Sequence, residues 1–387
     1  MDRRRIAVCL AGAAAFVPLY SPQSLLPLLR AWMGQDVALA GAIMSAGTAG
    51  VALAAPFAGV IADRLGHRRV IVFAALFAAL PGLLCALAPS AGFLIVARFL
   101  QGLVLPGIFA VTVAYIAQEW PAVQARPVTA LYVAGTIGGG YAGRMLAGMV
   151  AELAGWRWAF AALAMLQLAL AWAIVAWLTP EQARQRTETT ARPPMLSLLA
   201  LPQLRAACAA GFAALFALVA GFTYITLRLA EAPFELGPAQ LSLIFTVYLL
   251  SVIVTPWSGR LMNRYGHTAM LVSAWSLAIV GLLVTVPDRL GAVVIGLCLF
   301  STGLFIAQAT VTTFVGEAVP QARATAVGLY VTSYYIGGTV GGILPALIWR
   351  LAHWPGVVAL ITLAGAGAVT LGVRAFRLGR LSTSPPA

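Results

Sequence analysis

Long, uninterrupted apolar runs constrain this chain more than any other feature. The stretches from Val70 to Leu87 and from Ala159 to Leu178 are almost continuously apolar. Runs of about 18 or more apolar residues predict membrane-spanning helices, because peptide groups in lipid must hydrogen-bond within their own segment. A transmembrane β-barrel would instead alternate apolar and polar positions. The sequence therefore predicts an all-α polytopic membrane protein.

The composition sets the number of spans. The chain is 61% hydrophobic and 9% charged, whereas soluble domains are about 45–50% apolar and about 25% charged. This balance excludes a soluble globular protein. At about 20 residues per span, the apolar positions of 387 residues suffice for about twelve transmembrane helices.

Charge clusters, glycine and proline breaks and run length place those twelve helices. The first six are predicted at 6–29, 37–62, 70–88, 91–116, 128–151 and 157–178. The second six are predicted at 203–228, 238–260, 269–286, 291–316, 323–349 and 355–377. The first run is too long for the apolar core of a signal peptide, so we expect an uncleaved span.

One long polar stretch divides the two sets. Residues 179–202 carry charged residues, threonines and the pair Pro193-Pro194, a composition typical of a flexible linker. We therefore predict three parts: an N-terminal six-helix bundle over 1–178, a cytoplasmic linker over 179–202, and a C-terminal six-helix bundle with a short cytoplasmic tail over 203–387.

The distribution of arginine predicts the orientation. With the N-terminus inside, seventeen of the 24 basic residues lie on the cytoplasmic side and five lie outside, as expected for short loops that retain arginine. Both termini are therefore predicted to be cytoplasmic, in a plasma (inner) membrane. The net charge is +13, but the basic residues form no long basic tract. The expected partner is therefore the anionic bilayer surface and not nucleic acid.

An internal repeat predicts the symmetry. The loop sequence Gly59-Val-Ile-Ala-Asp63-Arg64-Leu-Gly66-His67 recurs 200 residues later as Gly259-Arg-Leu-Met-Asn263-Arg264-Tyr-Gly266-His267. Further landmarks recur at nearly the same offset: Glu119 with Arg126 as Glu317 with Arg323, and Ile137-Gly138-Gly139 as Ile336-Gly337-Gly338. Two parallel six-span repeats related by an axis along the membrane normal are an arrangement typical of secondary transporters.

On these residues the chain resembles the major facilitator superfamily over essentially its whole length. The loop from Gly59 to Arg69 looks like the family's signature between spans 2 and 3, and Arg98-Phe-Leu-Gln101-Gly102 looks like the span 4 motif of its proton-coupled members. The first span, from Pro18 to Pro27, is similar to that of twelve-span drug and sugar efflux proteins. The resemblance implies two pseudo-symmetric six-helix bundles that alternate between inward-open and outward-open states.

The loop after span 2 is interpreted as a cytoplasmic gating motif. Asp63 can pair with Arg68, Arg69 or the positive end of another helix when the two halves close on the cytoplasmic side. Gly59 is expected to allow a close helix contact and Gly66 a turn with positive φ. The second copy has Asn263 and so lacks the fixed negative charge. The proposed motif comprises Gly59, Asp63, Arg64, Gly66, Arg68 and Arg69; an ordinary basic turn is the alternative.

Two arginines, Arg98 and Arg144, fall inside predicted spans. A charge there costs at least about 2.5–3.5 kcal/mol and usually marks a functional site. Either arginine could line the cavity, or it could donate to carbonyls of a neighbouring helix. Since spans 1, 4, 7 and 10 line the cavity in the family, and Arg144 is added for its charge, the candidate substrate-cavity residues are Tyr20, Gln23, Arg98, Gln101, Arg144, Thr223, Tyr224 and Gln308.

No acidic residue lies in the middle of a predicted span. This departs from proton antiporters with a carboxylate inside the membrane, and arginine does not titrate near neutral pH. If protons are coupled, the best carriers are Asp36 at the head of span 2 and Glu152 below Arg144. Span 5 has Tyr141 after Gly139-Gly140, where the antiporter motif has a Gly-Pro pair; this weakens the prediction of export.

Glycines at a spacing of four residues predict close helix crossings. They are Gly135, Gly139 and Gly143 in span 5, and Gly337 with Gly341 in span 11. Such a ridge could serve as a hinge seam between the two halves or as static packing.

The predicted function is secondary active transport, with proton-coupled efflux of a small amphipathic compound or sugar as the leading interpretation. An importer or facilitator of an organic anion or sugar-like solute is the alternative, because both charges inside spans are positive. A nontransporting membrane scaffold is a remote alternative. We expect a monomer. We also expect no enzymatic activity, cofactor or metal, since the sequence has no GxSxG, HExxH or Walker A pattern and its four cysteines lack metal-ligand spacing.

Overall fold

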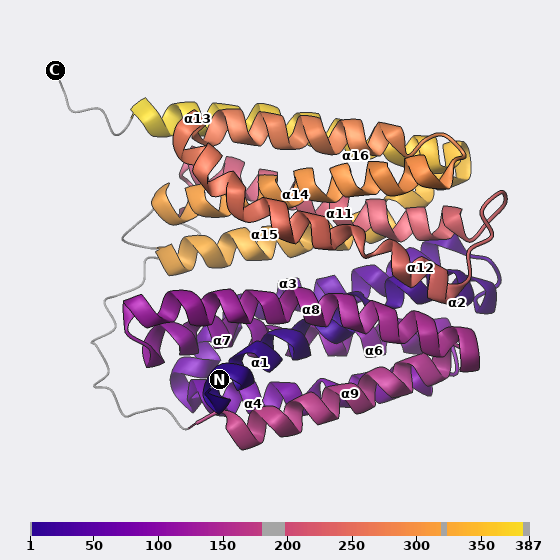
Figure 1. Ribbon diagram of the computed structural model, residues 1–387, viewed down its shortest axis with the longest axis horizontal. Coiled ribbons are helices and arrows are strands. Elements are labelled where there is room, and N and C mark those ends of the chain that lie inside the picture. Colours follow the sequence, from indigo (N-terminus) through magenta and orange to yellow (C-terminus); the bar gives the residue numbers. More distant parts are fainter. Residues whose placement is uncertain (1, 180–197, 319–322, 382–387) are drawn as a thin grey trace. The chain divides into compact units, whose positions relative to one another are not determined.

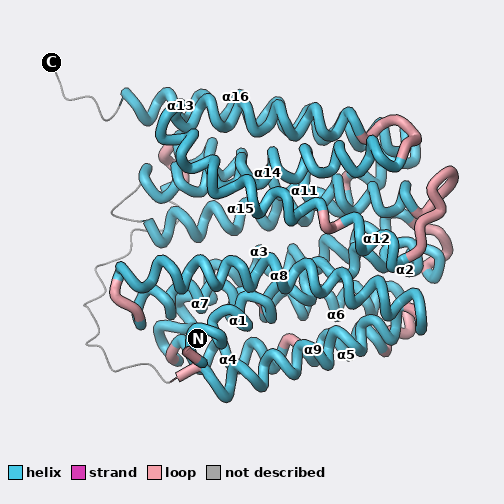
Figure 2. Tube along the Cα trace, in the orientation of Figure 1, coloured by secondary structure: helices cyan, strands magenta, loops and turns pink. Residues whose placement is uncertain are grey.

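The computed structural model describes residues 2–179, 198–318 and 323–381. Within these ranges every regular element is helical and none is a strand, as Figure 2 shows. The all-α fold class is therefore confirmed. Most of the predicted linker, residues 180–197, and the end of the predicted tail, residues 382–387, lie outside the described residues.

Helices follow the first six predicted spans (Figure 1). The first span is broken into α1, the 3-10 helix η1 and α2. The third and fourth spans are each divided once. The bounds are α1 Arg3–Tyr20, η1 Ser21–Leu25, α2 Leu26–Trp32, α3 Val37–Leu65, α4 His67–Phe77, α5 Ala79–Ala86, α6 Ala91–Val104, α7 Pro106–Glu119, α8 Ala122–Ala154 and α9 Trp156–Trp177.

Helices also follow the second six spans. Their bounds are α11 Pro202–Leu229, α12 Pro238–Ile244, α13 Val247–Val284, α14 Leu290–Ala318, α15 Arg323–Ile343 and α16 Pro345–Leu381. Non-helical backbone at Gly266 divides α13, and the same occurs at Ala352 and His353 within α16. Each of these two long helices therefore contributes to two of the predicted spans. In the described part of the chain, nine helices are long and apolar enough to cross a membrane.

Contacts group the chain into two compact units. The first contains the described residues of 1–187, 229–231 and 235–245, and the second those of 188–228, 232–234 and 246–387. Helix α12 belongs to the first unit, where it packs against α8, although it begins the eighth predicted span.

Short polar side chains begin several of the helices. Asp36 precedes α3 and accepts hydrogen bonds from the backbone N–H groups of Ala38 at 2.7 Å and Leu39 at 3.4 Å. Ser90 precedes α6 and accepts from the N–H of Phe93 at 3.3 Å. Because the first N–H groups of a helix have no partner within it, these side chains fix where the helices start.

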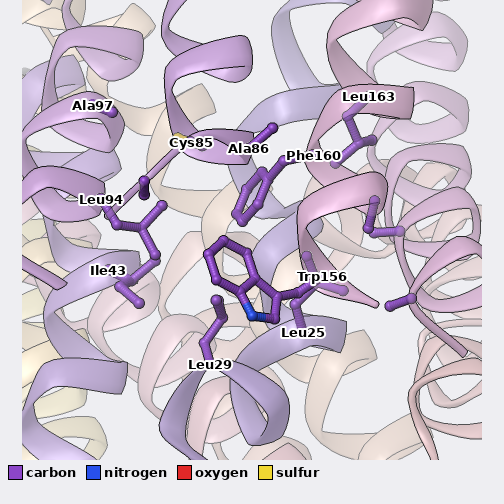
Figure 3. Packing of buried hydrophobic residues seen from close by; sticks show 14 of the residues in the cluster. Leu25, Leu29, Ile43, Cys85, Ala86, Leu94, Ala97, Trp156, Phe160 and Leu163 are labelled. Atoms are coloured by element: carbon purple, nitrogen blue, oxygen red, sulfur yellow. The ribbon is translucent and has the colours of Figure 1, made fainter. Parts of the chain in front are cut away.

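An aromatic and aliphatic cluster forms a core within the first unit (Figure 3). The rings of Trp156 and Phe160 on α9 meet edge to face, 6.2 Å apart. Leu25 of η1 and Leu29 of α2 are fully buried in the same cluster. Burying side chains of this size is worth about 1.5–3 kcal/mol each in water, and here their packing holds the broken first span against α9.

The predicted glycine ridge of span 5 lies along α1. A Cβ added to Gly135 would lie 2.0 Å from the carbonyl oxygen of Cys9, and one added to Gly139 would lie 2.4 Å from Cα of Ala13. The close crossing is therefore confirmed. Since α1 and α8 belong to the same unit, the ridge packs helices within one bundle, which supports static packing. Gly337 on α15 meets α11 in the same way.

Candidate functional site

The break in the first span is the centre of the candidate site in the first unit. Helix α1 contains Pro18, and Pro22 follows in η1. Proline has no N–H, so Pro22 cannot donate to the carbonyl of Pro18 four residues earlier. Buried carbonyls need a donor, most of all in lipid. The proline spacing therefore creates a demand for donors at this point.

Arg98 on α6 supplies those donors. Its Nη1 donates to the carbonyl of Pro18 at 2.8 Å, and its Nη2 donates to the carbonyl of Leu19 at 2.6 Å. Nη1 also donates to Oε1 of Gln101, one turn along the same helix. Arg98 is 1% exposed. Of the two interpretations that the sequence allows, the geometry supports the structural one, in which Arg98 satisfies backbone carbonyls of a neighbouring helix.

Gln101 has a matching role on α6. Its Oε1 accepts from Arg98, and its Nε2 donates to the carbonyl of Ala78 at 3.3 Å. Ala78 lies at the junction of α4 and α5. Arg98 and Gln101 thus connect two helix breaks, one in the first span and one in the third.

Arg144 on α8 reaches the same broken segment from another side. Its Nε donates to Oε1 of Gln23 at 2.9 Å, and its Nη1 donates to the carbonyl of Gly140 at 2.9 Å. The guanidinium carbon lies 5.1 Å from the ring centroid of Tyr20 and 4.6 Å from that of Phe245. A desolvated cation–π contact is worth about 2 kcal/mol. Arg144 therefore links α8, the break after α1 and the segment that follows α12.

The structure brings five of the eight candidate cavity residues together around η1 in the first unit. They are Tyr20, Gln23, Arg98, Gln101 and Arg144, and all five are buried. Phe245 joins them and was not predicted. An aromatic residue in an apolar run has no signal in one sequence that distinguishes it from ordinary packing.

The other three candidates lie in the second unit with different surroundings. Tyr224 donates from its hydroxyl to the carbonyl of Gly342 at 2.8 Å, and its ring lies 5.7 Å from that of Trp349. It therefore joins α11 to α15 and α16. Thr223 is fully buried, and its hydroxyl has no hydrogen-bond partner among the described residues. Gln308 on α14 is half-buried.

The loop predicted to be a cytoplasmic gating motif has the expected turn. Gly66 between α3 and α4 has φ of 94°, and Gly266 at the equivalent position has φ of 81°. The positive φ predicted at Gly66 is confirmed, and the second repeat has the same backbone conformation at Gly266. Oδ1 of Asp63 lies 3.8 Å from Nε2 of His67, one turn away. Arg68 donates to the carbonyl of Leu178 at 2.6 Å, just after α9, where a cation also suits the helix dipole.

The remaining motif residues face outward from the first unit. Arg64 and Arg69 are exposed. A Cβ added to Gly59 would meet no described atom within 4 Å, so the close helix contact expected there stays a prediction. A glycine permits a neighbouring helix to come close, but the packing of the helices decides whether such a contact forms.

The sequence did not point to a charged cluster between the start of α1 and the end of α7. Arg4 on α1 forms an ion pair with Glu119 at the end of α7. Its guanidinium carbon lies 4.2 Å from the ring centroid of Trp120, and its Nε donates to the hydroxyl of Tyr115 at 3.3 Å. The internal repeat pointed to Glu119 but not to its partner, because Arg4 lies 115 residues earlier in the chain.

The two candidate proton carriers both lie at helix N-termini. Asp36 caps α3, as described above. Oε2 of Glu152, near the end of α8, accepts from the backbone N–H of Ala239 at 3.3 Å at the start of α12. No cluster of three histidine, cysteine, aspartate or glutamate side chains that could hold a metal ion occurs in the described part of the chain.

Comparison with known proteins places the chain among transporters. The model of the Major Facilitator Superfamily matches residues 8–342 and 229–386. The inner membrane transport protein YnfM of Escherichia coli is 31% identical over 383 residues, which cover 97% of this chain and 91% of that protein. The MFS-type transporter YybF of Bacillus subtilis is 28% identical over 357 residues, covering 91% of this chain and 88% of that protein.

Solved structures share the fold. The crystal structure of a mutant of the nucleoside transporter NupG superposes with a TM-score of 0.77 at 15% sequence identity, covering 96% of this chain and 99% of that one. A bacterial homolog of the human lysosomal transporter Spinster, in an inward-facing and occupied conformation, gives a TM-score of 0.76 at 13% identity, covering 99% and 98%. At these identities the likeness concerns the fold.

Proposed function

Because the chain belongs to the major facilitator superfamily, a family of membrane transporters, we propose that it exports a small uncharged amphipathic or sugar-like compound in exchange for protons. Its relatives are transporters and not enzymes. Alternating access between inward-open and outward-open states is the mechanism that the family membership supports.

We choose an uncharged substrate because of the surroundings of the two arginines inside the spans. Arg98 is bound to two backbone carbonyls and Gln101, and Arg144 is bound to Gln23 and lies against two aromatic rings. Both charges therefore stabilise the broken first span. No carboxylate that could neutralise a cationic substrate lies in the middle of a predicted span. The polar groups that suit a solute are amides and hydroxyls, such as Thr223 with its buried hydroxyl.

We assign proton binding to Glu152, with Asp36 as the second candidate. The carboxylate of Glu152 accepts a hydrogen bond from the backbone N–H of Ala239 at the start of α12. A proton on that oxygen would compete with this hydrogen bond and loosen the contact between α8 and α12. The similarity of Arg98-Phe-Leu-Gln101-Gly102 to the motif of proton-coupled members supports the same coupling.

The test is proton flux in proteoliposomes with an acidic lumen, to which lipophilic cations, sugars and organic anions are added in turn. We expect a sugar-like or uncharged amphipathic compound to collapse the gradient. The Asp36→Asn, Glu152→Gln double variant should transport with altered pH dependence, whereas Glu235→Gln, at an exposed outer acidic residue, should behave as wild type. An unchanged pH dependence in the double variant would overturn the assignment of the proton carriers.

A second candidate function is facilitated movement of an organic anion. It is favoured by one observation, that both charges inside the spans are positive. In the same vesicles, a labelled organic anion would then equilibrate without collapse of the proton gradient. Replacing Arg144 with glutamine would abolish this flux if Arg144 attracts the anion, whereas the flux of an uncharged solute would fall only as far as the fold is disturbed.

A further inference from the structure

Each unit has an apolar groove on its surface. The groove of the first unit has a volume of about 560 Å³ and lies between α3, α4 and the junction of α6 with α7. The groove of the second unit has a volume of about 410 Å³ and lies between the two parts of α13 and α14. Each groove lies wholly within one unit.

The two grooves occupy equivalent positions in the two repeats. Described lining residues pair at an offset of 200, the offset of the sequence repeat: Ala54 with Val254, Ile61 with Leu261, and Leu65 with Tyr265. The side chains differ in size and chemistry, yet the hollow is present in both copies. A packing defect has no reason to recur at the same place, so the hollow belongs to the repeated architecture.

The first groove has the length of one lipid leaflet. Its lining on α3 runs from Leu53 to Leu65, and twelve helical steps span about 18 Å. Half of a hydrocarbon core that is about 30 Å thick is about 15 Å. Phe57 and Phe73 in the lining are each 58% exposed, so the groove opens at the surface of the first unit and suits an apolar occupant. It ends at the loop with Gly66, which the arginine distribution predicts to be cytoplasmic.

Basic side chains lie at the end of each groove. In the first unit, Arg64 and Arg69 are exposed on either side of the Gly66 turn. Asp63 is also exposed there, and its Oδ1 lies 3.8 Å from His67. In the second unit, Arg264 is exposed, and its guanidinium carbon lies 5.3 Å from the ring centroid of Tyr265, which lines the groove.

We propose that both grooves bind anionic phospholipids of the cytoplasmic leaflet. One acyl chain lies in each groove, and the headgroup phosphate meets Arg64 and Arg69 in the first unit and Arg264 in the second. Arginine suits this role because its planar guanidinium donates two parallel hydrogen bonds to a phosphate. The proposal is independent of which solute the protein transports.

Native mass spectrometry of the full chain tests the acyl-chain sites. Delipidated protein is titrated with phosphatidylglycerol and, separately, with phosphatidylcholine carrying the same acyl chains. We expect wild type to retain two copies of phosphatidylglycerol. Ala54→Trp and Val254→Trp, which fill one groove each, should lower the number by one, and the double variant should retain neither copy. Val60→Trp is the matched control, since Val60 is exposed on α3 and does not line the groove.

Loss of the basic residues tests the headgroup. Arg69→Gln should weaken retention of phosphatidylglycerol by about fivefold, the effect of one arginine near an anionic lipid, and should leave phosphatidylcholine unchanged. Arg126→Gln, at an exposed position on α8, should have no effect.

Three results would overturn the proposal. Equal retention by Ala54→Trp and Val60→Trp would exclude the groove as the site. Equal retention of the two lipids by wild type would exclude recognition of the anionic headgroup. If Ala54→Trp does not fold, Ala54→Leu replaces it, and an unchanged phosphatidylglycerol number in that variant counts against the groove as well.

Discussion

Replacing Gly139 with alanine tests the packing of α1 against α8. The added Cβ would lie 2.4 Å from Cα of Ala13, about 1 Å closer than ordinary contact. The obstacle is backbone and cannot rotate away, so the two helices must separate. Inserting one methyl group into a packed interface costs about 1–3 kcal/mol.

The neighbouring glycine provides the matched control. A Cβ added to Gly138 would meet no described atom within 4 Å. Both substitutions gain the same intrinsic helix propensity, about 1 kcal/mol, so this gain cancels when the variants are compared. The free energy of unfolding of Gly139→Ala should therefore be about 1–3 kcal/mol below that of Gly138→Ala. For a cooperative unit of this size, that corresponds to a melting temperature about 2–12 °C lower.

The assay is thermal unfolding in detergent, followed by reaction of a fluorogenic thiol reagent with cysteines that are buried in the fold. Cys85 and Cys208 are buried, one in each unit. The labelling midpoint of Cys85 should shift in Gly139→Ala, because Cys85 belongs to the unit that contains α1 and α8. Equal midpoints for the two alanine variants would refute the packing argument.

Three further outcomes follow from the contacts. Arg98→Met should lose about 1–3 kcal/mol, since the buried carbonyl of Leu19 loses the Arg98 donor while that of Pro18 keeps the Ser21 hydroxyl at 3.3 Å, and Arg98→Lys should lose less; equal thermal stability of Arg98→Met and wild type would contradict the structural role. Tyr224→Phe should lose about 1–3 kcal/mol by leaving the carbonyl of Gly342 unpaired while the KM for transport stays constant, and a raised KM would instead place Tyr224 against the substrate. Glu119→Gln should destabilise the contact between α1 and α7 by breaking the ion pair with Arg4. This should be seen as faster amide exchange at the start of α1, and exchange that matches wild type would argue against that link.

The sequence alone determined the features that depend on local chemistry and on the periodicity of residue types along the chain. The continuous apolar runs predicted the helices, and each predicted span has helix at its place. The glycine in the loop after the second span predicted positive φ at Gly66, because a side chain strains that backbone. The spacing of four residues predicted the close contact at Gly139, because small residues four apart lie on one face of a helix.

Only the tertiary structure decided which partners the polar residues take. Arg98 donates to a carbonyl 80 residues earlier in the chain, and Arg144 donates to a glutamine 121 residues earlier. Sequence spacing carries no information about contacts between segments so far apart. The same holds for Phe245, which is indistinguishable from ordinary packing until its ring lies against Arg144. The sequence therefore showed that a charge inside a span is unusual at Arg98 and at Arg144. The role of each arginine depended on which backbone carbonyls and side chains the packed helices placed within hydrogen-bonding distance.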